Sequence, residues 1–280
     1  MEYKTLNNGV KMPMLGYGVY QVAPEECERC VLDALSVGYR AVDTAQAYAN
    51  EEGVGSALKK SGVPRGEVFL TTKVWITDAG EEKAARSIDE SLRKLGTDYV
   101  DLLLIHQPFG DYYGTYRAME KAYKAGKARA IGVSNFYPDR FIDLANFCEV
   151  TPAVNQVETH VFQQQKVARG VAEKYGTLIQ SWGPFAEGKN GIFTNETLVK
   201  IGKKYGKTAA QTALRFLLQS GVAIIPKSTH KERMAENLDV LNFSLSEEDM
   251  REISALDTGK SLFFSHYDPR TVEWFMSLVR

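Results

Sequence analysis

Residues 100–106 read VDLLLIH, a continuous apolar run that carries one acidic residue near its start and ends in a histidine. Apolar and polar residues do not alternate in this run, as expected for a strand of a parallel sheet that is covered on both faces. The preceding segment, Glu81–Leu95, places apolar residues at helical spacing and stops at Gly96. Together the two segments predict a helix that leads into a buried parallel strand.

The same pairing recurs along the whole chain. Eight short apolar runs are candidate strands, at residues 14–18, 41–43, 68–73, 100–106, 128–134, 153–157, 178–182 and 222–226. Segments with helical spacing lie between them, including residues 138–147, residues 164–175 and a segment that runs from the capping residue Thr208 to Gly221. Eight strands alternating with helices predict a single α/β domain over residues 1–280, a (β/α)8 TIM barrel.

The beginning of the chain adds a hairpin to this barrel. Asn7, Asn8 and Gly9 form a turn signal that predicts a β-hairpin before the first barrel strand. A doubly wound sheet is the alternative architecture for the same alternation of strands and helices. The first strand is not followed by the Gly-x-Gly-x-x-Gly turn used by dinucleotide-binding sheets of that type, which favours the barrel.

The composition is that of an ordinary soluble protein and argues against several classes of function. Hydrophobic residues make up 44% of the chain, charged residues 25%, and the net charge is -1. Basic residues are spread along the chain, so we expect neither nucleic acid nor a membrane surface as a partner. No apolar stretch approaches the roughly 20 residues of a membrane-spanning helix. The first residues lack the apolar core of a secretory signal, so we expect a cytoplasmic protein.

The three cysteines do not predict a disulfide framework. Cys27 and Cys30 have the spacing of a zinc or redox pair, but the chain contains no second pair, and their surroundings fit an amphipathic helix. We therefore expect two reduced cysteines on a helix and no metal site.

Ionisable residues follow three successive predicted strands at the point where each strand ends. Asp43 ends the second strand, with Tyr48 in the loop after it, Lys73 ends the third strand and His106 ends the fourth. Catalytic groups of (β/α)8 barrels sit at this end of the strands. One such residue is explained equally well by a strand leaving the core for solvent, but the four together supply the parts of a proton donor.

The chemistry of such a donor is specific. Tyrosine has a pKa of about 10, too high for ready proton donation at neutral pH, and a nearby ammonium group lowers that pKa because it stabilises the phenolate. A carboxylate beside the lysine keeps the lysine charged and fixes its position. The histidine is suited to holding a substrate oxygen, so the set predicts general acid catalysis.

Motifs around these residues resemble those of the aldo-keto reductase family. They are, in chain order, DTAQAYANE at 43–51, TKVW at 72–75, LIHQP at 104–108, IGVSNF at 131–136, VNQVE at 154–158 and IPKS at 225–228. The resemblance covers nearly the whole chain and is to the bacterial type, similar to diketogluconate and glyoxal reductases. It implies that Tyr48 is the general acid, that Lys73 paired with Asp43 lowers the pKa of Tyr48, and that His106 orients the substrate carbonyl.

The resemblance also implies an NADPH/NADP cofactor. Three residues match the positions that bind the nicotinamide carboxamide, namely Ser134, Asn135 and Gln156. Trp182 stands where the family usually has a tyrosine that stacks on the nicotinamide, and packing in the barrel core is the alternative role for its indole. The residues after it begin a loop expected to pass over the pyrophosphate, namely Gly183, Pro184 and Phe185.

The segment after the eighth predicted strand opens a helix, which is a suitable place for an anion. By the resemblance, Lys227 and Arg233 bind the 2′-phosphate of NADP, the arginine as a fork and the lysine as a point charge. His230 replaces a hydroxyl residue common at its position, which leaves the full set of phosphate contacts open. Further cofactor contacts are expected from the same segment, the last two with the adenine: Ser228, Thr229, Glu236 and Asn237.

The substrate pocket is expected to be lined by four residues at matching positions, namely Tyr20, Trp75, His106 and Gln107. Phe109 is a further candidate on local grounds. Gln107 stands where many animal members carry tryptophan, so we expect a more polar pocket wall. The aromatic tail, residues 262–264 and 274–275, either packs in the core or closes the substrate site. A short tail and a polar wall predict an open pocket.

The expected partner is a small carbonyl substrate, and the chain is expected to be a monomer or a weak homo-oligomer. Two other functions fit parts of the pattern. One is a non-catalytic NADP-binding sensor or structural subunit, although such proteins often lose one of the four catalytic residues and all four are present here. The other is a Schiff-base aldolase acting through Lys73, which needs a lysine of lowered pKa, whereas Asp43 is expected to keep Lys73 charged.

Overall fold

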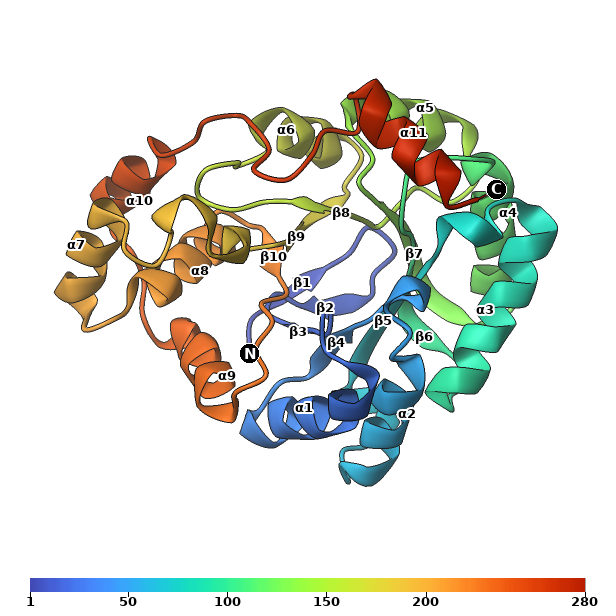
Figure 1. Ribbon diagram of the computed structural model, residues 1–280, viewed down its shortest axis with the longest axis horizontal. Helices are drawn as coiled ribbons and strands as arrows, with labels where there is room; N and C mark the ends of the chain where they lie inside the picture. The colour runs from blue at the N-terminus through green and yellow to red at the C-terminus, as the bar shows by residue number, and fades with distance from the viewer. Residues whose placement is uncertain (280) are drawn as a thin grey trace.

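The fold was analysed in a computed structural model that describes residues 1–279. The barrel strands are β3 (Tyr17–Gly18), β4 (Ala41–Asp43), β5 (Phe69–Val74), β6 (Val100–Ile105), β7 (Ala128–Ser134), β8 (Val154–Glu158), β9 (Leu178–Trp182) and β10 (Ala223–Ile224). They form one sheet in the order β10-β9-β8-β7-β6-β5-β4-β3, and all neighbouring strands are parallel. The sheet closes on itself, because Gly16 N donates to Ile224 O and Ile224 N donates to Met14 O. The predicted (β/α)8 barrel is confirmed (Figure 1).

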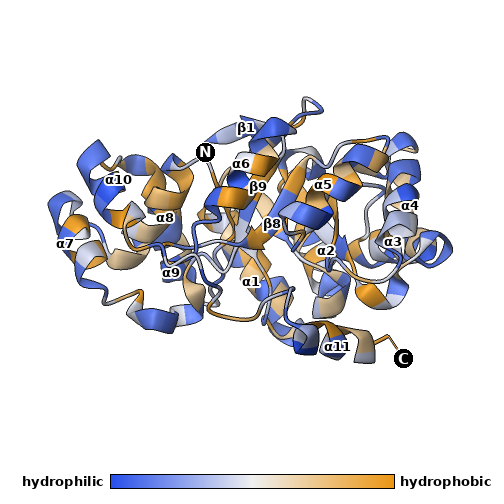
Figure 2. Ribbon diagram, turned by 90° about the horizontal axis from the view of Figure 1, so that it is seen from above, coloured by the Kyte–Doolittle hydropathy of each residue, from blue (hydrophilic) through white to orange (hydrophobic). Residues whose placement is uncertain are grey.

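Helices surround the barrel. They are α1 (Pro24–Val37), α2 (Glu51–Lys60), α3 (Glu81–Leu95), α4 (Tyr112–Lys124), α5 (Pro138–Phe147), α6 (Lys166–Lys174), α7 (Glu196–Tyr205), α8 (Ala209–Gln219), α9 (Lys231–Leu238), α10 (Glu247–Ser254) and α11 (Pro269–Ser277). Figure 2 shows hydrophobic strands such as β8 in the middle and helices of mixed hydropathy around them. Gly96 ends α3 in the left-handed conformation, and Thr208 with Gln211 forms a capping box at the start of α8, as predicted for these two ends.

Two boundaries differ from those expected. α6 begins at Lys166 rather than at residue 164, because Gln165 lies in the left-handed conformation with φ 54°. In addition, the Gln164 side chain donates to backbone carbonyls outside the helix, including that of Val161 at 2.9 Å. β10 contains two residues, although the bond from Gly18 N to a carbonyl beyond β10 continues the pairing.

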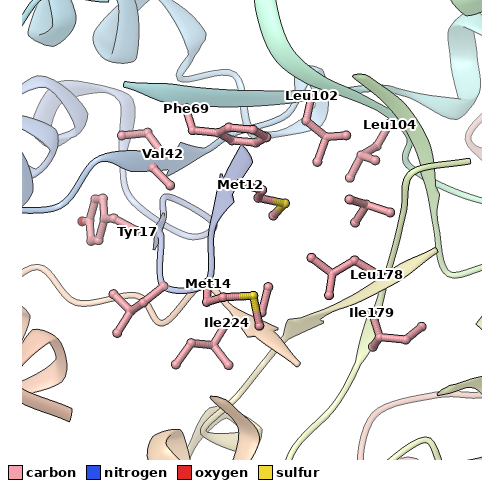
Figure 3. Close-up of a cluster of buried hydrophobic side chains, with 14 of the residues drawn as sticks. Met12, Met14, Tyr17, Val42, Phe69, Leu102, Leu104, Leu178, Ile179 and Ile224 are labelled. Carbon is pink, nitrogen blue, oxygen red and sulfur yellow. The ribbon is translucent and has the colours of Figure 1, made fainter. Parts of the chain in front are cut away.

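A hairpin closes the amino end of the barrel. β1 (Tyr3–Thr5) pairs with β2 (Lys11–Pro13) in antiparallel fashion, as predicted from the turn signal. The side-chain amides of Asn7 and Asn8 donate to backbone carbonyls at the starts of β8 and β7, at 3.2 and 2.9 Å. Met12 and Met14 point among the apolar side chains of the barrel strands (Figure 3). In the view of Figure 2, β1 and α11 lie on opposite faces of the barrel.

Cys27 and Cys30 are buried free thiols on α1. Burial raises the pKa of Cys27 to about 12, which disfavours the thiolate required for redox or metal chemistry. Within residues 1–279 no three ligand-type side chains are grouped so that they could hold a metal ion. None of the described helices has both the length and the apolar character of a membrane-crossing segment.

Candidate active site

The four predicted catalytic side chains lie at the carboxyl ends of three adjacent strands. Asp43 is the last residue of β4, Lys73 is near the end of β5, and His106 directly follows β6. Tyr48 ends η1 (Gln46–Tyr48), a short 3-10 helix in the loop after β4. Because β4, β5 and β6 are hydrogen-bonded neighbours, these residues meet on one side of the barrel mouth.

Lys73 is the centre of this cluster. Its Nζ forms an ion pair with Asp43 Oδ1, donates to Thr44 O at 2.9 Å and donates to Tyr48 Oη at 3.3 Å. The Lys73 side chain is fully buried. An ammonium group has three donors, and these contacts use all of them, so the position of the charge is fixed.

Burial and charge act on this pair in opposite directions. Burial raises the pKa of the Tyr48 phenol and Lys73 lowers it, with a net rise above the ordinary value. For Lys73, burial lowers the pKa, but Asp43 and Tyr48 outweigh burial, so the pKa is also raised. Lys73 therefore acts on Tyr48 in the expected direction. The prediction of a lowered Tyr48 pKa is nevertheless wrong for the net effect, because desolvation of the phenolate is larger.

His106 presents a neutral imidazole to the site. Burial, with a contribution from Lys73, lowers the pKa of His106 well below its ordinary value. The ring packs edge-on against Tyr48 and Trp75, with centroids 5.5 and 4.9 Å apart. Its Nδ1 is buried and has no hydrogen-bond partner among the described residues. Packing, rather than a hydrogen bond from behind, therefore holds the ring.

Gln156, expected at the nicotinamide carboxamide, contacts the catalytic carboxylate instead. Its Nε2 donates to Asp43 Oδ2 and to Gln180 Oε1, each at 2.8 Å. One oxygen of Asp43 is thus bound by Lys73 and the other by Gln156. Gln180 is absent from the predicted site, and the only signal for it is a polar residue inside the apolar run 178–182.

Ser134, Asn135 and Trp182 form a second hydrogen-bonded group at the barrel mouth. Asn135 Nδ2 donates to His106 O at 3.0 Å, and Asn135 Oδ1 accepts from Trp182 Nε1 at 2.9 Å. Ser134 Oγ donates to Gln156 O at 2.8 Å. The indole is only partly buried and lies outside the clusters of core residues. The alternative of a barrel-core tryptophan is therefore wrong.

The predicted phosphate-binding residues lie at the start of α9. Lys227 and Arg233 are exposed, and neither forms an ion pair within residues 1–279. His230 precedes the first residue of α9, and no side chain caps the helix there. Two cations beside uncapped helix amides suit an anion such as a phosphate group.

The other residues of this segment are partly committed to bonds within the protein. Ser228 Oγ accepts from His230 N at 3.1 Å, and Thr229 is half-buried. Glu236 Oε1 accepts from Thr208 Oγ1 at 2.9 Å, and Asn237 is buried. Their predicted contacts with the cofactor stay predictions.

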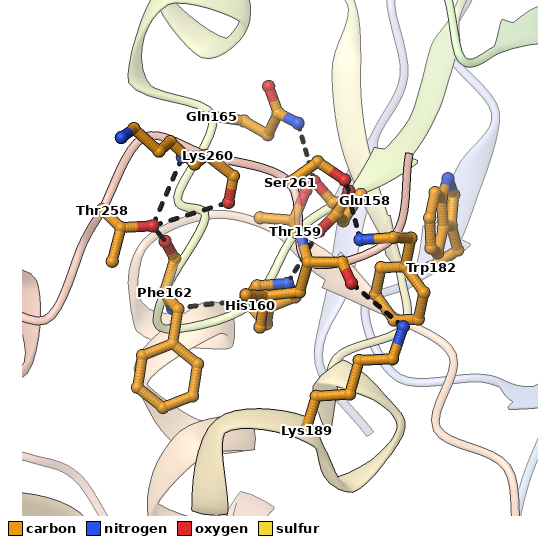
Figure 4. A network of polar contacts seen from close by, with 12 residues as sticks. Glu158, Thr159, His160, Phe162, Gln165, Trp182, Lys189, Thr258, Lys260 and Ser261 are labelled. Atoms are coloured by element: carbon orange, nitrogen blue, oxygen red, sulfur yellow. Dashed lines mark hydrogen bonds and ion pairs between the residues drawn. The ribbon is translucent and has the colours of Figure 1, made fainter. Parts of the chain in front are cut away.

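The loop after β9 is tied to the C-terminal tail (Figure 4). Lys189 Nζ donates to Leu262 O at 3.0 Å and lies 3.9 Å from the centre of the Phe263 ring. The Glu158 carboxylate at the end of β8 accepts from Ser261 Oγ at 2.5 Å and from Leu262 N at 2.9 Å. The tail therefore bridges β8 and the loop that begins with Gly183, Pro184 and Phe185.

The expected substrate residues surround Tyr48 and His106, but the pocket wall differs from the prediction. Tyr20 is 52% exposed and its ring lies 5.1 Å from that of Tyr48. Trp75 packs on His106 and its backbone N–H donates to Gln46 Oε1 at 2.8 Å. Gln46 is a further residue absent from the predicted set, although it lies inside the matching motif at 43–51.

Gln107 does not form an exposed polar wall. It is 7% exposed, and its Oε1 lies 2.8 Å from His266 Nε2 in the tail. Phe109 is buried against Phe275 of α11, with ring centroids 5.3 Å apart. The tail covers this side of the mouth, so the expected open pocket is wrong here. A lone histidine within the aromatic tail is the only sequence signal for the contact.

Comparison with known proteins gives one consistent result. A model of the aldo/keto reductase family matches residues 12–258. The chain is 46% identical over 254 residues to glyoxal reductase of Bacillus subtilis, which covers 90% of this chain and 91% of that protein. It is 41% identical over 260 residues to methylglyoxal reductase of Escherichia coli, covering 92% and 94%. Among solved structures, a mutant of Gox0644 in complex with NADPH has a TM-score of 0.89 at 37% identity, covering 94% of this chain and 96% of that one.

Proposed function

The chain belongs to the aldo/keto reductase family, and we propose that it reduces the carbonyl group of a small aldehyde or ketone to an alcohol with NADPH. The observation that carries the proposal is the buried Lys73 ammonium, which contacts both Asp43 and Tyr48. The relatives named for glyoxal and methylglyoxal support a small substrate with two adjacent carbonyl groups.

Tyr48 is the proton donor in this proposal. Its raised pKa keeps the phenol protonated at neutral pH. As the carbonyl carbon is reduced, the oxygen becomes an alkoxide, which is a much stronger base than a phenolate and so takes the proton from Tyr48. Lys73, 3.3 Å from Tyr48 Oη, stabilises the resulting phenolate in a site of low dielectric. Asp43 in turn keeps Lys73 charged.

His106 holds the carbonyl oxygen in this proposal. Its pKa lies well below the ordinary value, so the ring is neutral and adds no second positive charge beside Lys73. Its Nδ1 is buried, which leaves Nε2 as the nitrogen that can meet a substrate. A neutral imidazole with hydrogen on Nε2 donates one hydrogen bond, enough to orient a carbonyl oxygen toward Tyr48.

The residues around His106 and at α9 fit a nicotinamide cofactor. When bound, NADPH supplies the hydride that reduces the carbonyl carbon. Ser134 and Asn135 would hold the carboxamide, and Trp182, oriented by its bond to Asn135, would offer its indole face for stacking. Lys227 and Arg233 have no ion-pair partner in residues 1–279, and a 2′-phosphate would supply one.

The same cluster disfavours an aldolase. A Schiff base forms on a neutral amine, and an aldolase lysine needs a lowered pKa. The pKa of Lys73 is raised, and all three of its hydrogens are engaged with protein oxygens.

The proposal is tested by NADPH oxidation with a panel of carbonyl compounds: glyoxal, methylglyoxal, diketogluconate, a simple aldehyde and a simple ketone. We expect loss of NADPH absorbance with at least one dicarbonyl compound and formation of the matching alcohol. A protein that binds NADPH but turns over none of the panel would be a non-catalytic subunit, contrary to the proposal.

A further inference from the structure

His266 occupies an unusual place in the tail. It lies between α10 and α11, is 4% exposed, and is stacked between two aromatic rings. The Phe109 centroid is 5.6 Å away at an interplanar angle of 27°, and the Phe275 centroid is 5.8 Å away at 15°. A buried imidazole costs desolvation free energy that a phenylalanine in the same cluster would not. The structure therefore needs a reason for an imidazole here.

The one side-chain hydrogen bond of this imidazole supplies that reason. His266 Nε2 lies 2.8 Å from Gln107 Oε1, and an amide oxygen can only accept, so this assignment places the hydrogen on Nε2. His266 Nδ1 is then a bare acceptor, and it is buried without a partner among the described residues. Burial, with Arg140, lowers the pKa of His266 to about 4, so the ring is neutral at neutral pH. The imidazole thus works as a single N–H donor aimed at Gln107.

Gln107 is the residue next to His106, and His106 lacks support from behind. Catalytic and metal-binding histidines are commonly oriented by a hydrogen bond to their second ring nitrogen. Here Nδ1 of His106 has no such partner in residues 1–279. The orientation of the His106 ring must therefore come from its backbone and from the rings packed on it.

Both of these supports lead to His266. Along the backbone, the His106 carbonyl is held by Asn135 Nδ2 at 3.0 Å, and the next side chain, Gln107, is held by His266. Through the rings, His106 packs on Trp75 and Trp75 packs on Phe275, at 4.9 and 6.3 Å between centroids. Phe275 in turn stacks on His266.

We propose that His266 is a positioning residue that keeps the His106 ring in the orientation that binds the substrate carbonyl, acting through Gln107 and through Phe275 and Trp75. The proposal rests on the proposed carbonyl reduction for its catalytic consequence. The orientation of His106 can be measured without turnover, so the two claims can fail separately.

Two variants of His266 separate the hydrogen bond from the packing. His266→Phe keeps an aromatic ring in the cluster and removes the donor, whereas His266→Gln keeps an N–H donor within reach of Gln107. We expect His266→Phe to lower kcat for methylglyoxal about tenfold, because small misplacements of a catalytic group cost rate steeply. NADPH affinity should stay within about twofold. His266→Gln should recover at least about a third of the wild-type kcat.

Tyr267→Phe is the matched control. Tyr267 is the next residue of the tail, is 62% exposed, and donates to Asp139 Oδ1 at 3.0 Å on α5. Its removal loosens the tail by one hydrogen bond without touching Gln107. We expect kcat to stay within about twofold of wild type. If His266→Phe does not fold, Gln107→Leu removes the same bond from the other side and should lower kcat in the same way.

Imidazole ¹⁵N NMR of the protein without cofactor reads the orientation directly. The chain has four histidines, so the ring signals can be assigned with single variants. In His266→Phe the His106 signals should shift, while those of His160 and His230 stay in place. A lower melting temperature with unchanged kcat and unchanged His106 signals would make His266 a purely structural residue and overturn the proposal. If the wild-type protein reduces no carbonyl compound, the proposed function fails, and the NMR comparison alone decides the positioning role.

Discussion

The two ends of the barrel each bury a carboxylate against cations, yet only one end can move a proton. At the amino end, Asp101 is 1% exposed and accepts from Arg65 at 2.9 Å, from Arg129 at 2.7 Å and from the Leu70 amide at 2.9 Å. Arginine does not release its proton in proteins, and none of these partners is a hydroxyl. This cluster can therefore fix strands but cannot supply a proton.

At the carboxyl end, the buried carboxylate reaches a titratable group. Asp43 binds Lys73, and Lys73 also contacts the phenol of Tyr48. The phenol is partly exposed at the mouth. The difference teaches that a buried ion pair marks a reaction centre only when it is coupled to a proton carrier that a ligand can reach. The position of the pair at the carboxyl end of the strands supplies that access.

Tyr48→Phe should separate the two ends most strongly. It removes the proton carrier and leaves the Asp43 and Lys73 pair in place, so kcat should fall by about 10² to 10⁴. NADPH affinity and the melting temperature should stay close to those of wild type. Steady-state kinetics and a cofactor titration measure the first two quantities. Rates within about threefold of wild type would remove Tyr48 from its role.

Asp101→Asn should show the opposite pattern. Breaking a buried ion pair leaves uncompensated charge, and we expect the free energy of unfolding to fall by about 3 kcal/mol. This is the lower end of the usual range, because the side chains of Arg65 and Arg129 are 23% and 46% exposed. Urea unfolding measures the loss. Below the unfolding transition kcat should be unchanged, and a large drop in kcat at unchanged stability would contradict the division between the ends.

Arg233→Ala tests the open charge at the edge of the carboxyl end. It should weaken NADPH binding relative to NADH binding by roughly 1.5 to 3 kcal/mol, the scale of lost hydrogen bonds to a charged group. Fluorescence titration with both cofactors gives the difference. Equal losses for NADPH and NADH would mean that the 2′-phosphate does not bind at Arg233.

Trp182→Ala tests whether the indole serves the cofactor or the fold. We expect a loss of about 1 to 3 kcal/mol in NADPH binding, by analogy with stacking of bases on aromatic rings. Unfolding should change little, because the indole lies outside the core clusters. Trp182→Phe keeps a stacking face and loses the 2.9 Å bond to Asn135, so its loss should be smaller. Normal NADPH binding together with a strongly lowered melting temperature would reverse this assignment.

Much of the fold could be predicted because its signals are local. Continuous apolar runs, the stop at Gly96 and the cap at Thr208 each depend on a few neighbouring residues. The four catalytic residues could be predicted for a related reason. The barrel brings all strand ends to one face, so position along each strand is sufficient to place Asp43 and Lys73 together.

The remainder depends on contacts between distant parts of the chain. Gln156 reaches Asp43 across 113 positions, and His266 reaches Gln107 across 159 positions. No local pattern encodes either pair. The pKa of Tyr48 was likewise out of reach, because its direction depends on how completely packing removes water, and burial outweighs the contribution of Lys73.

The central claim is that the carboxyl end transfers a hydride to a carbonyl carbon while Tyr48 protonates the oxygen. The most direct test is a single turnover of the wild-type protein with methylglyoxal and NADPH deuterated at the transferable position of the nicotinamide. The account predicts one deuterium on the new alcohol carbon for each NADPH consumed, and a much slower transfer in Tyr48→Phe. Consumption of NADPH without deuterium on that carbon would contradict it.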